Sequence, residues 1–155
     1  MTLGAPANEA AFESRLRVYY EDTDAGGIVY HANWLRYFER VRTDWLRSLG
    51  AVHRELAQRD GVLLVVRDMH IDYRLPAALD DELRVDVGLL EARRASLRLR
   101  QSAWSVPDGR LLVQAELRVA AIDARHHRAA GLPRWLLARL ASPPNTAPPH
   151  QGPCR

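Results

Sequence analysis

The sequence predicts an α+β protein in which one long helix covers one face of a curved sheet of five mainly antiparallel strands. Two patterns support this prediction. Residues 33–49 repeat apolar side chains at helical spacing, whereas several later segments alternate apolar and polar side chains with a period of two. An early strand and one helix, followed by four strands in succession, are typical of the α+β class.

The N-terminal part of the chain contains the helix and the segments that lead to it. Residues 1–13 show no hydrophobic period and are expected to form a flexible leader to a folded domain of residues 14–141. Residues 14–20 contain valine and tyrosine and are expected to form the first strand. Gly50 is a suitable C-cap for the helix, whose apolar face is expected to consist of Leu35, Phe38, Val41, Trp45, Leu46 and Leu49.

Four alternating segments follow the helix, at residues 69–73, 83–89, 95–103 and 111–121. Short turns join the later ones, including Pro-Asp-Gly at residues 107–109, and this arrangement predicts an antiparallel meander. Residues 133–140 fit a short terminal helix. Residues 142–155 contain five prolines and are expected to be disordered.

Length and composition predict a single cytoplasmic domain. The 155 residues contain no apolar run near the roughly 20 residues that span a membrane, so we expect no stable membrane insertion. The first residues lack the basic and apolar regions of a secretory signal. The single cysteine, Cys154, provides neither an intrachain disulfide nor a cysteine metal site.

The charge pattern argues against nucleic-acid binding. The formal net charge is +3, and 22 arginines, with no lysine, are interspersed with 19 acidic residues. No block of like charges forms the clustered basic face that a nucleic acid would need. Because guanidinium groups suit phosphate, a few of these arginines could hold a phosphorylated ligand such as coenzyme A.

The loop at residues 20–33 contains the most informative motif. Asp24 and His31 lie seven residues apart around a Gly-Gly pair, directly before the helix. Gly27 permits a positive φ or a close approach to a ligand, and the helix start offers unpaired N–H groups. A carbonyl bound there would meet both a carboxylate and hydrogen-bond donors, which suits acyl transfer or acyl hydrolysis. Alternatively, Asp24 caps the helix or lies in a solvated turn, and His31 is packed or lies on the surface.

The motif Tyr-x-Asp-Thr-Asp-x-x-Gly-x-Val-Tyr-His, at residues 20–31, resembles the signature of hotdog-fold acyl-CoA thioesterases. These form the 4-hydroxybenzoyl-CoA thioesterase family, and the similarity, which covers residues 16–137, is strongest to its subgroup associated with the bacterial Tol-Pal system. The resemblance implies a hotdog fold and hydrolysis of a short-chain aliphatic acyl-CoA to a free acid and coenzyme A. It also implies a homodimer or homotetramer, with sheets joined edge to edge and substrate bound across a subunit interface. No metal or redox cofactor is implied, since coenzyme A belongs to the substrate.

The resemblance also implies roles for individual residues. Asp24 matches the essential carboxylate, as a nucleophile that forms a mixed anhydride or as a general base for water. The His31 main-chain N–H matches the oxyanion donor, and its ring could orient water, polarise the carbonyl or protonate the leaving thiolate. Tyr20 matches an active-site tyrosine, although a strand-end tyrosine that packs its ring is equally compatible. Val29 and Tyr30 are expected to line the acyl pocket.

A second candidate site lies in the turn between two predicted strands. The family places its pantetheine and nucleotide contacts there, which here implies Arg93, Arg94 and Ser96 as substrate-binding residues. A solvated arginine turn is the alternative interpretation.

The sequence gives no metal site. A calcium loop that began at Asp22 would need an oxygen ligand at Gly26 and a glutamate at Asn33, and it has neither. His126 and His127 are flanked by arginines and lack matching ligands. We expect Asp22 to organise the loop by accepting backbone hydrogen bonds.

Two alternative functions stay open. An aromatic acyl-CoA thioesterase would use an aromatic wall, for which Trp34, Tyr37 and Tyr30 are candidates. A non-catalytic partner of acyl carrier protein or of an envelope complex would have no need of the Asp24, Gly-Gly and His31 constellation.

Overall fold

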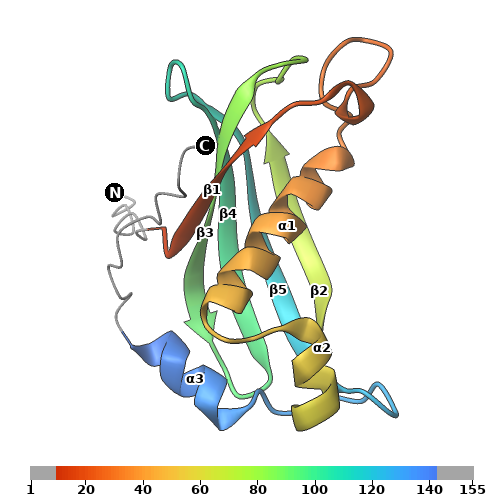
Figure 1. The fold of residues 1–155 in the computed structure, drawn as a ribbon, viewed down its shortest axis with the longest axis vertical. Coiled ribbons are helices and arrows are strands. Elements are labelled where there is room, and N and C mark those ends of the chain that lie inside the picture. The colour runs from red at the N-terminus through yellow and green to blue at the C-terminus, as the bar shows by residue number, and fades with distance from the viewer. Residues whose placement is uncertain (1–9, 143–155) are drawn as a thin grey trace, which may run out of the picture.

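The computed structural model describes residues 10–142 of the 155-residue chain and contains the predicted sheet and long helix (Figure 1). The strands are β1 (Phe12–Arg17), β2 (Val62–Tyr73), β3 (Glu82–Ala92), β4 (Ser96–Ser105) and β5 (Leu111–Asp123). The helical segments are η1 (Tyr20–Asp22), α1 (Asn33–Ser48), α2 (His53–Glu55), η2 (Leu56–Asp60) and α3 (Arg134–Ala141). The predicted leader up to residue 9 and the predicted tail from residue 143 lie outside the described residues.

The strand order is β1-β3-β4-β5-β2, and all neighbouring strands are antiparallel. Only β3, β4 and β5 form a meander, so the prediction of a four-strand meander was wrong for β2, which pairs with β5. Residues 74–81 carry the chain from β2 across to β3. Period-two alternation identifies the side chains that face the core, but it does not identify which strands pair. β2 is therefore an edge strand, and its outer side has no partner within the described residues.

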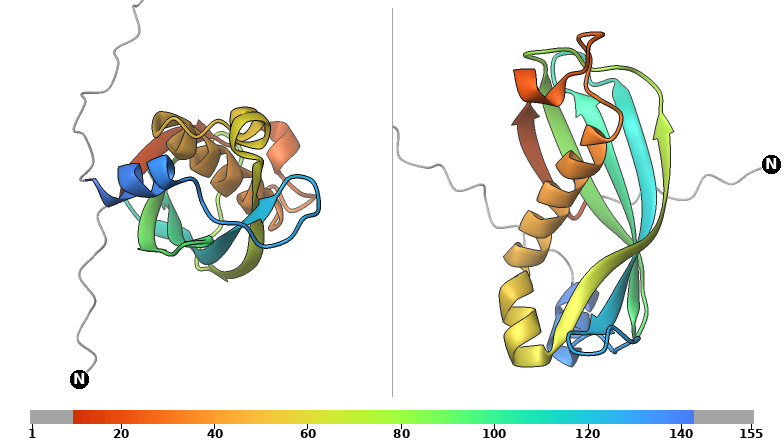
Figure 2. Two further views of the ribbon diagram at one scale, coloured as in Figure 1. Left: turned by 90° about the horizontal axis from the view of Figure 1, so that it is seen from below. Right: turned by 90° about the vertical axis from the view of Figure 1, so that its right-hand side faces the viewer.

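Figure 2 shows α1 lying along one face of the curved sheet. Burial of each large apolar side chain on this interface stabilises the fold by about 1.5–3 kcal/mol. Leu35 was predicted to lie on the buried face but is 42% exposed. The buried face is centred instead on the helical series Trp34, Phe38, Val41 and Trp45, at i, i+4, i+7 and i+11. The buried apolar residues of α1 are Trp34, Tyr37, Phe38, Val41, Trp45 and Leu46.

A buried polar contact fixes the middle of α1 against β4. The Arg42 guanidinium donates to Gln101 Oε1 at 2.8 Å, and Gln101 Nε2 donates to the Phe38 carbonyl at 2.9 Å. Both side chains are buried, and burial lowers the pKa of Arg42. Because buried donors and acceptors must find partners, this contact sets the position of the helix along the sheet.

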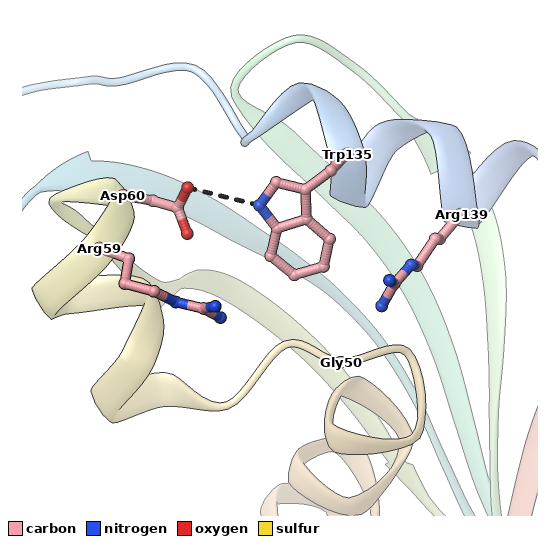
Figure 3. A pocket seen from close by; sticks show the side chains of 5 residues that line it. All are labelled: Gly50, Arg59, Asp60, Trp135 and Arg139. Carbon is pink, nitrogen blue, oxygen red and sulfur yellow. Dashed lines mark hydrogen bonds between the residues drawn. The ribbon is translucent and has the colours of Figure 1, made fainter.

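The short helix α3 holds the C-terminal end of α1 (Figure 3). The Arg139 guanidinium donates to the Leu49 carbonyl and lies 5.1 Å from the centre of the Trp135 ring, whose N–H donates to Asp60 at 3.4 Å. These side chains, with Gly50 and Arg59, line a pocket of about 380 Å³. Its arginines are engaged within the protein, since Arg59 also pairs with a glutamate of α2, and we therefore assign the pocket a structural role.

Gly50→Ala tests this contact. Gly50 has φ +87°, and a Cβ there would clash with the Arg139 guanidinium, whereas Gly61 has φ +65° and open space around it. Gly50→Ala should lower the free energy of unfolding by about 2 kcal/mol, roughly 1 kcal/mol more than Gly61→Ala, because Arg139 must leave Leu49. Urea unfolding measures both losses. In an Arg139→Ala background the two substitutions should become equivalent, and equal losses in the parent protein would contradict this assignment.

Candidate active site

The buried carboxylate of Asp22 ties the two ends of the motif loop together. Its Oδ2 accepts the Tyr19 N–H at 2.9 Å, and its Oδ1 accepts Asn33 Nδ2 at 3.0 Å. Its main-chain carbonyl accepts the Tyr30 N–H at 2.9 Å. Asp22 therefore organises the loop, as predicted, and it also joins the loop to the first residue of α1. Asn33 was not predicted as part of the site; the available signal was a polar residue at the start of an amphipathic helix.

Tyr37 packs behind this network. Its hydroxyl is buried and makes no hydrogen bond within residues 10–142. Burial, and after it the proximity of the Asp22 carboxylate, raises the pKa of Tyr37 well above its ordinary value. The Tyr37 side chain therefore packs behind Asp22, and the exposed side of the loop is its outer side.

Asp24 lies on that outer, exposed side, in a tight turn. Its Oδ1 accepts the Gly26 N–H at 2.8 Å, its carbonyl accepts the Gly27 N–H at 3.0 Å, and its own N–H donates to the Ile28 carbonyl at 2.9 Å. Gly27 has φ +77°, and a Cβ there would meet no atom within 4 Å. The turn therefore requires glycine for its backbone conformation, and it leaves the main chain accessible from outside.

A pocket of about 320 Å³ opens beside Asp24 at the start of α1. Of the residues proposed from the sequence, it brings together Asp24 and Tyr30. Arg36, one turn into the helix, was not foreseen. The lining residues are Glu21, Thr23, Asp24, Tyr30, Ala32, Asn33 and Arg36.

The other predicted loop residues lie around this pocket and do not line it. The His31 side chain is exposed, and its ring lies 4.6 Å from the Tyr30 ring, centre to centre. Tyr20 is the first residue of η1 and is 83% exposed, so its ring is not packed. Val29 is buried and donates its N–H to the Ala77 carbonyl at 2.8 Å, which anchors the end of the turn.

Two main-chain N–H groups at the start of α1 are unpaired within the described part of the chain. Within residues 10–142, neither the His31 N–H nor the Ala32 N–H has a hydrogen-bond acceptor, and the N-cap, Ala32, offers no side-chain cap. Free N–H groups and the positive end of the helix dipole stabilise negative charge on a bound group.

The arginine turn lies at the opposite end of the molecule from Asp24. In Figure 1 the motif loop is at the upper end of α1, and the β3–β4 turn is at the lower end of the sheet. Arg93 and Ser96 line a small pocket there, but the Arg94 side chain lies beside Gly131 instead. Arg93 also binds Glu91, and this hydrogen bond lowers the pKa of the Glu91 carboxyl.

Two further arginines, Arg98 and Arg118, line that small pocket and were not identified from the sequence. They lie opposite each other on β4 and β5, a pairing that only the strand register reveals. Four polar side chains, three of them guanidinium groups, therefore gather at this end of the sheet beside Glu91.

The predicted aromatic wall is largely absent. Trp34 and Tyr37 are buried in the core at 3% and 1% exposure, so Tyr30 alone reaches the pocket. Among residues 10–142, no group of three or more His, Cys, Asp or Glu side chains is arranged to hold a metal ion. The same part of the chain has no helix long and apolar enough to cross a membrane.

Comparisons with known proteins place these features in a family. The model of the Thioesterase-like superfamily matches residues 18–140. The acyl-CoA thioesterase YbgC of Haemophilus influenzae is 37% identical over 127 residues, which cover 82% of this chain and 92% of that protein. The acyl-CoA thioester hydrolase YbgC of Escherichia coli O157:H7 is 37% identical over 137 residues, covering 86% and 98%. A crystal structure of a probable thioesterase from Bartonella henselae has a TM-score of 0.73 at 32% identity and covers 78% and 98%.

A long helix on a five-stranded antiparallel sheet is the hotdog fold, which the similar thioesterase structure shares. This chain belongs to the Thioesterase-like superfamily. The resemblance inferred from residues 20–31, and the hotdog fold that it implied, are confirmed.

Asp22→Asn tests the loop network. An asparagine side chain presents one NH₂ group, so one of the two donors that now bind Asp22 would lose its acceptor in a buried position. We expect the free energy of unfolding to fall by about 2 kcal/mol, against less than about 1 kcal/mol for the exposed Asp24→Asn. Urea unfolding with a constant m-value measures both changes, and a loss at Asp22 no larger than at Asp24 would refute the role of Asp22.

Proposed function

We propose that this protein hydrolyses acyl-CoA thioesters to a free acid and coenzyme A, with Asp24 as the reacting carboxylate. The observation that carries the proposal is the position of Asp24, in a pocket at the start of α1 beside free main-chain N–H groups. The names of the YbgC relatives, acyl-CoA thioesterase and acyl-CoA thioester hydrolase, support the substrate class.

Two routes fit this geometry. In the first, Asp24 attacks the thioester carbonyl, the C–S bond breaks, and the thiolate of coenzyme A leaves and takes up a proton. Water then cleaves the mixed anhydride and regenerates the carboxylate. In the second, Asp24 removes a proton from water as the water attacks, and collapse of the tetrahedral intermediate expels the thiolate. Both routes pass through an oxyanion and need no metal or redox cofactor.

The remaining loop residues serve this chemistry. The His31 N–H at the helix start stabilises the oxyanion, and the exposed His31 ring provides a proton for the leaving thiolate. Tyr20 and Tyr30 border the acyl end of the substrate. The buried Val29 anchors the end of the turn beside the acyl group, and Gly27 keeps the main chain open to substrate. Because Tyr30 is the one aromatic residue among residues 10–142 that lines the Asp24 pocket, a short aliphatic acyl group is favoured over a benzoyl-type group.

The arginine pocket binds the phosphates of coenzyme A in this proposal. Arg93 and Ser96, which were predicted, act there with Arg98 and Arg118, while Arg94 contributes from the edge of the turn. This pocket and Asp24 lie at opposite ends of one chain, since the 16 residues of α1 alone extend about 24 Å between them. We therefore propose that one subunit supplies Asp24 and another supplies the phosphate contacts.

The free edge of β2 supports assembly into a homodimer, and two such dimers would form a tetramer. Coenzyme A enters as part of the substrate, and the acyl group could equally arrive on acyl carrier protein in a Tol-Pal-associated role. Cys154 has no partner for a disulfide, which is consistent with a reducing cytoplasm.

The first test is Asp24→Asn in a thiol-release assay with short, medium, long and benzoyl-type acyl-CoA substrates. Turnover should fall at least about 100-fold, while fold and oligomer mass stay unchanged, because the carboxylate is removed without a change of shape. Asp44→Asn, on the exposed face of α1, is the matched control and should keep full turnover.

Turnover that survives in Asp24→Asn would refute the mechanism. No turnover by the parent protein on any acyl-CoA would refute the proposed activity and favour a non-catalytic partner of acyl carrier protein or of an envelope complex.

Arg98→Gln tests the phosphate contacts. KM for an acyl-CoA should rise about 3- to 10-fold, the effect of one partly exposed charge, while KM for the same acyl group on pantetheine should stay the same. Arg110→Gln, in the β4–β5 hairpin, serves as the control. An equal rise for both substrates would place Arg98 outside the phosphate site.

A further inference from the structure

Tyr73, the last residue of β2, contacts the start of α1 through its side chain. Its hydroxyl donates to the main-chain carbonyl of His31 at 2.9 Å, although 42 residues separate the two in sequence. Its ring also packs edge-on against the His31 ring, with centres 6.4 Å apart.

The Tyr73 hydroxyl is the only hydrogen-bond donor to the His31 carbonyl within residues 10–142. At this end of α1 the Leu35 N–H turns to the Ala32 carbonyl, at 3.2 Å, and the Asn33 N–H turns to the Tyr30 carbonyl, at 2.8 Å. No helical N–H therefore fixes the orientation of the peptide that joins His31 to Ala32.

The orientation of that peptide matters for an oxyanion. A trans peptide is planar, so the His31 carbonyl and the Ala32 N–H point in opposite directions. With the carbonyl held toward Tyr73, the Ala32 N–H points away from Tyr73, and Ala32 lines the pocket of Asp24. A flip of this peptide would exchange the two groups and bring a carbonyl oxygen, which repels negative charge, to the position of the donor.

We propose that Tyr73 is a positioning residue for thioester hydrolysis, which holds the His31–Ala32 peptide with its carbonyl away from the reacting group, so that the Ala32 N–H is available as a second oxyanion donor beside the His31 N–H. This inference rests on the proposed function. Tyr73 differs from Asp24 and His31 in that it acts through the main chain and touches no substrate.

Tyr73 is well placed for this role because its backbone is firmly held. It pairs with Val113 of β5, and the next two N–H groups, of Arg74 and Leu75, both donate to the Leu112 carbonyl, at 2.8 and 3.0 Å. Desolvation raises the pKa of Tyr73 further above the neutral range, in which a tyrosine hydroxyl is a donor in any case. A rigid strand thus sets the geometry at the start of a helix with which it is not paired.

Tyr73→Phe removes only the hydroxyl and is the direct test. We expect kcat for the best acyl-CoA substrate to fall about tenfold or more, since an oxyanion donor loses its support. The dissociation constant of a thioether analogue of that substrate, which has no carbonyl to develop charge, should stay within about twofold. Tyr19→Phe is the matched control, because Tyr19 lies in the same loop region and is 61% exposed. Its kcat should equal that of the parent protein.

A second readout does not depend on turnover. Amide hydrogen exchange of residues 30–35 should become faster in Tyr73→Phe than in the parent protein or in Tyr19→Phe, with oligomer mass unchanged. Parent-like kcat and exchange in Tyr73→Phe, alongside an active parent protein, would overturn the role of Tyr73 and leave the proposed function intact. A rise in the dissociation constant of the thioether as large as the loss of activity would also overturn the role of Tyr73. An inactive parent protein would instead overturn the proposed function, and this role with it.

Discussion

Two donors from opposite ends of the motif loop, the Tyr19 N–H and the Asn33 carboxamide, converge on the buried Asp22 carboxylate. A buried carboxylate is stable only when its oxygens are hydrogen-bonded, so the loop closes in one way. That closure fixes where β1 ends, where α1 begins and where Asp24 must lie between them. The two carboxylates differ in burial: Asp22 is buried and holds the loop, whereas Asp24 is exposed and is the carboxylate that we propose reacts.

Because the Asn33 side chain is bound to Asp22, no side chain of the described residues caps the start of α1. With Ala32 at the N-cap and no capping side chain, the His31 and Ala32 N–H groups are left for a bound group. The proposed reaction uses these unpaired N–H groups, and Tyr73, on the edge strand β2, keeps the His31–Ala32 peptide oriented. The cationic pocket near Arg93 lies beyond the length of α1, which is why the proposed site needs two subunits.

Much of this arrangement could be predicted from local patterns. Helical spacing identified α1, alternation identified the strands, and residues 20–31 identified the loop and its family. Long-range pairing could not be predicted, because the partner of β2, the contact between Tyr73 and His31 and the juxtaposition of Arg98 with Arg118 depend on register between distant segments. The exposure of Leu35 was missed because apolar spacing marks a face only to within about one position.

The most direct test of the account is a crystal structure of the assembled protein with a non-hydrolysable acyl-CoA analogue, in which a methylene group replaces the thioester sulfur. We expect the analogue carbonyl oxygen within hydrogen-bond distance of the His31 N–H and the carbonyl carbon beside Asp24. We also expect the phosphates against Arg93 and Arg98 of a neighbouring subunit. An analogue whose carbonyl lies away from the start of α1, or whose phosphates and carbonyl are held by one subunit, would contradict it.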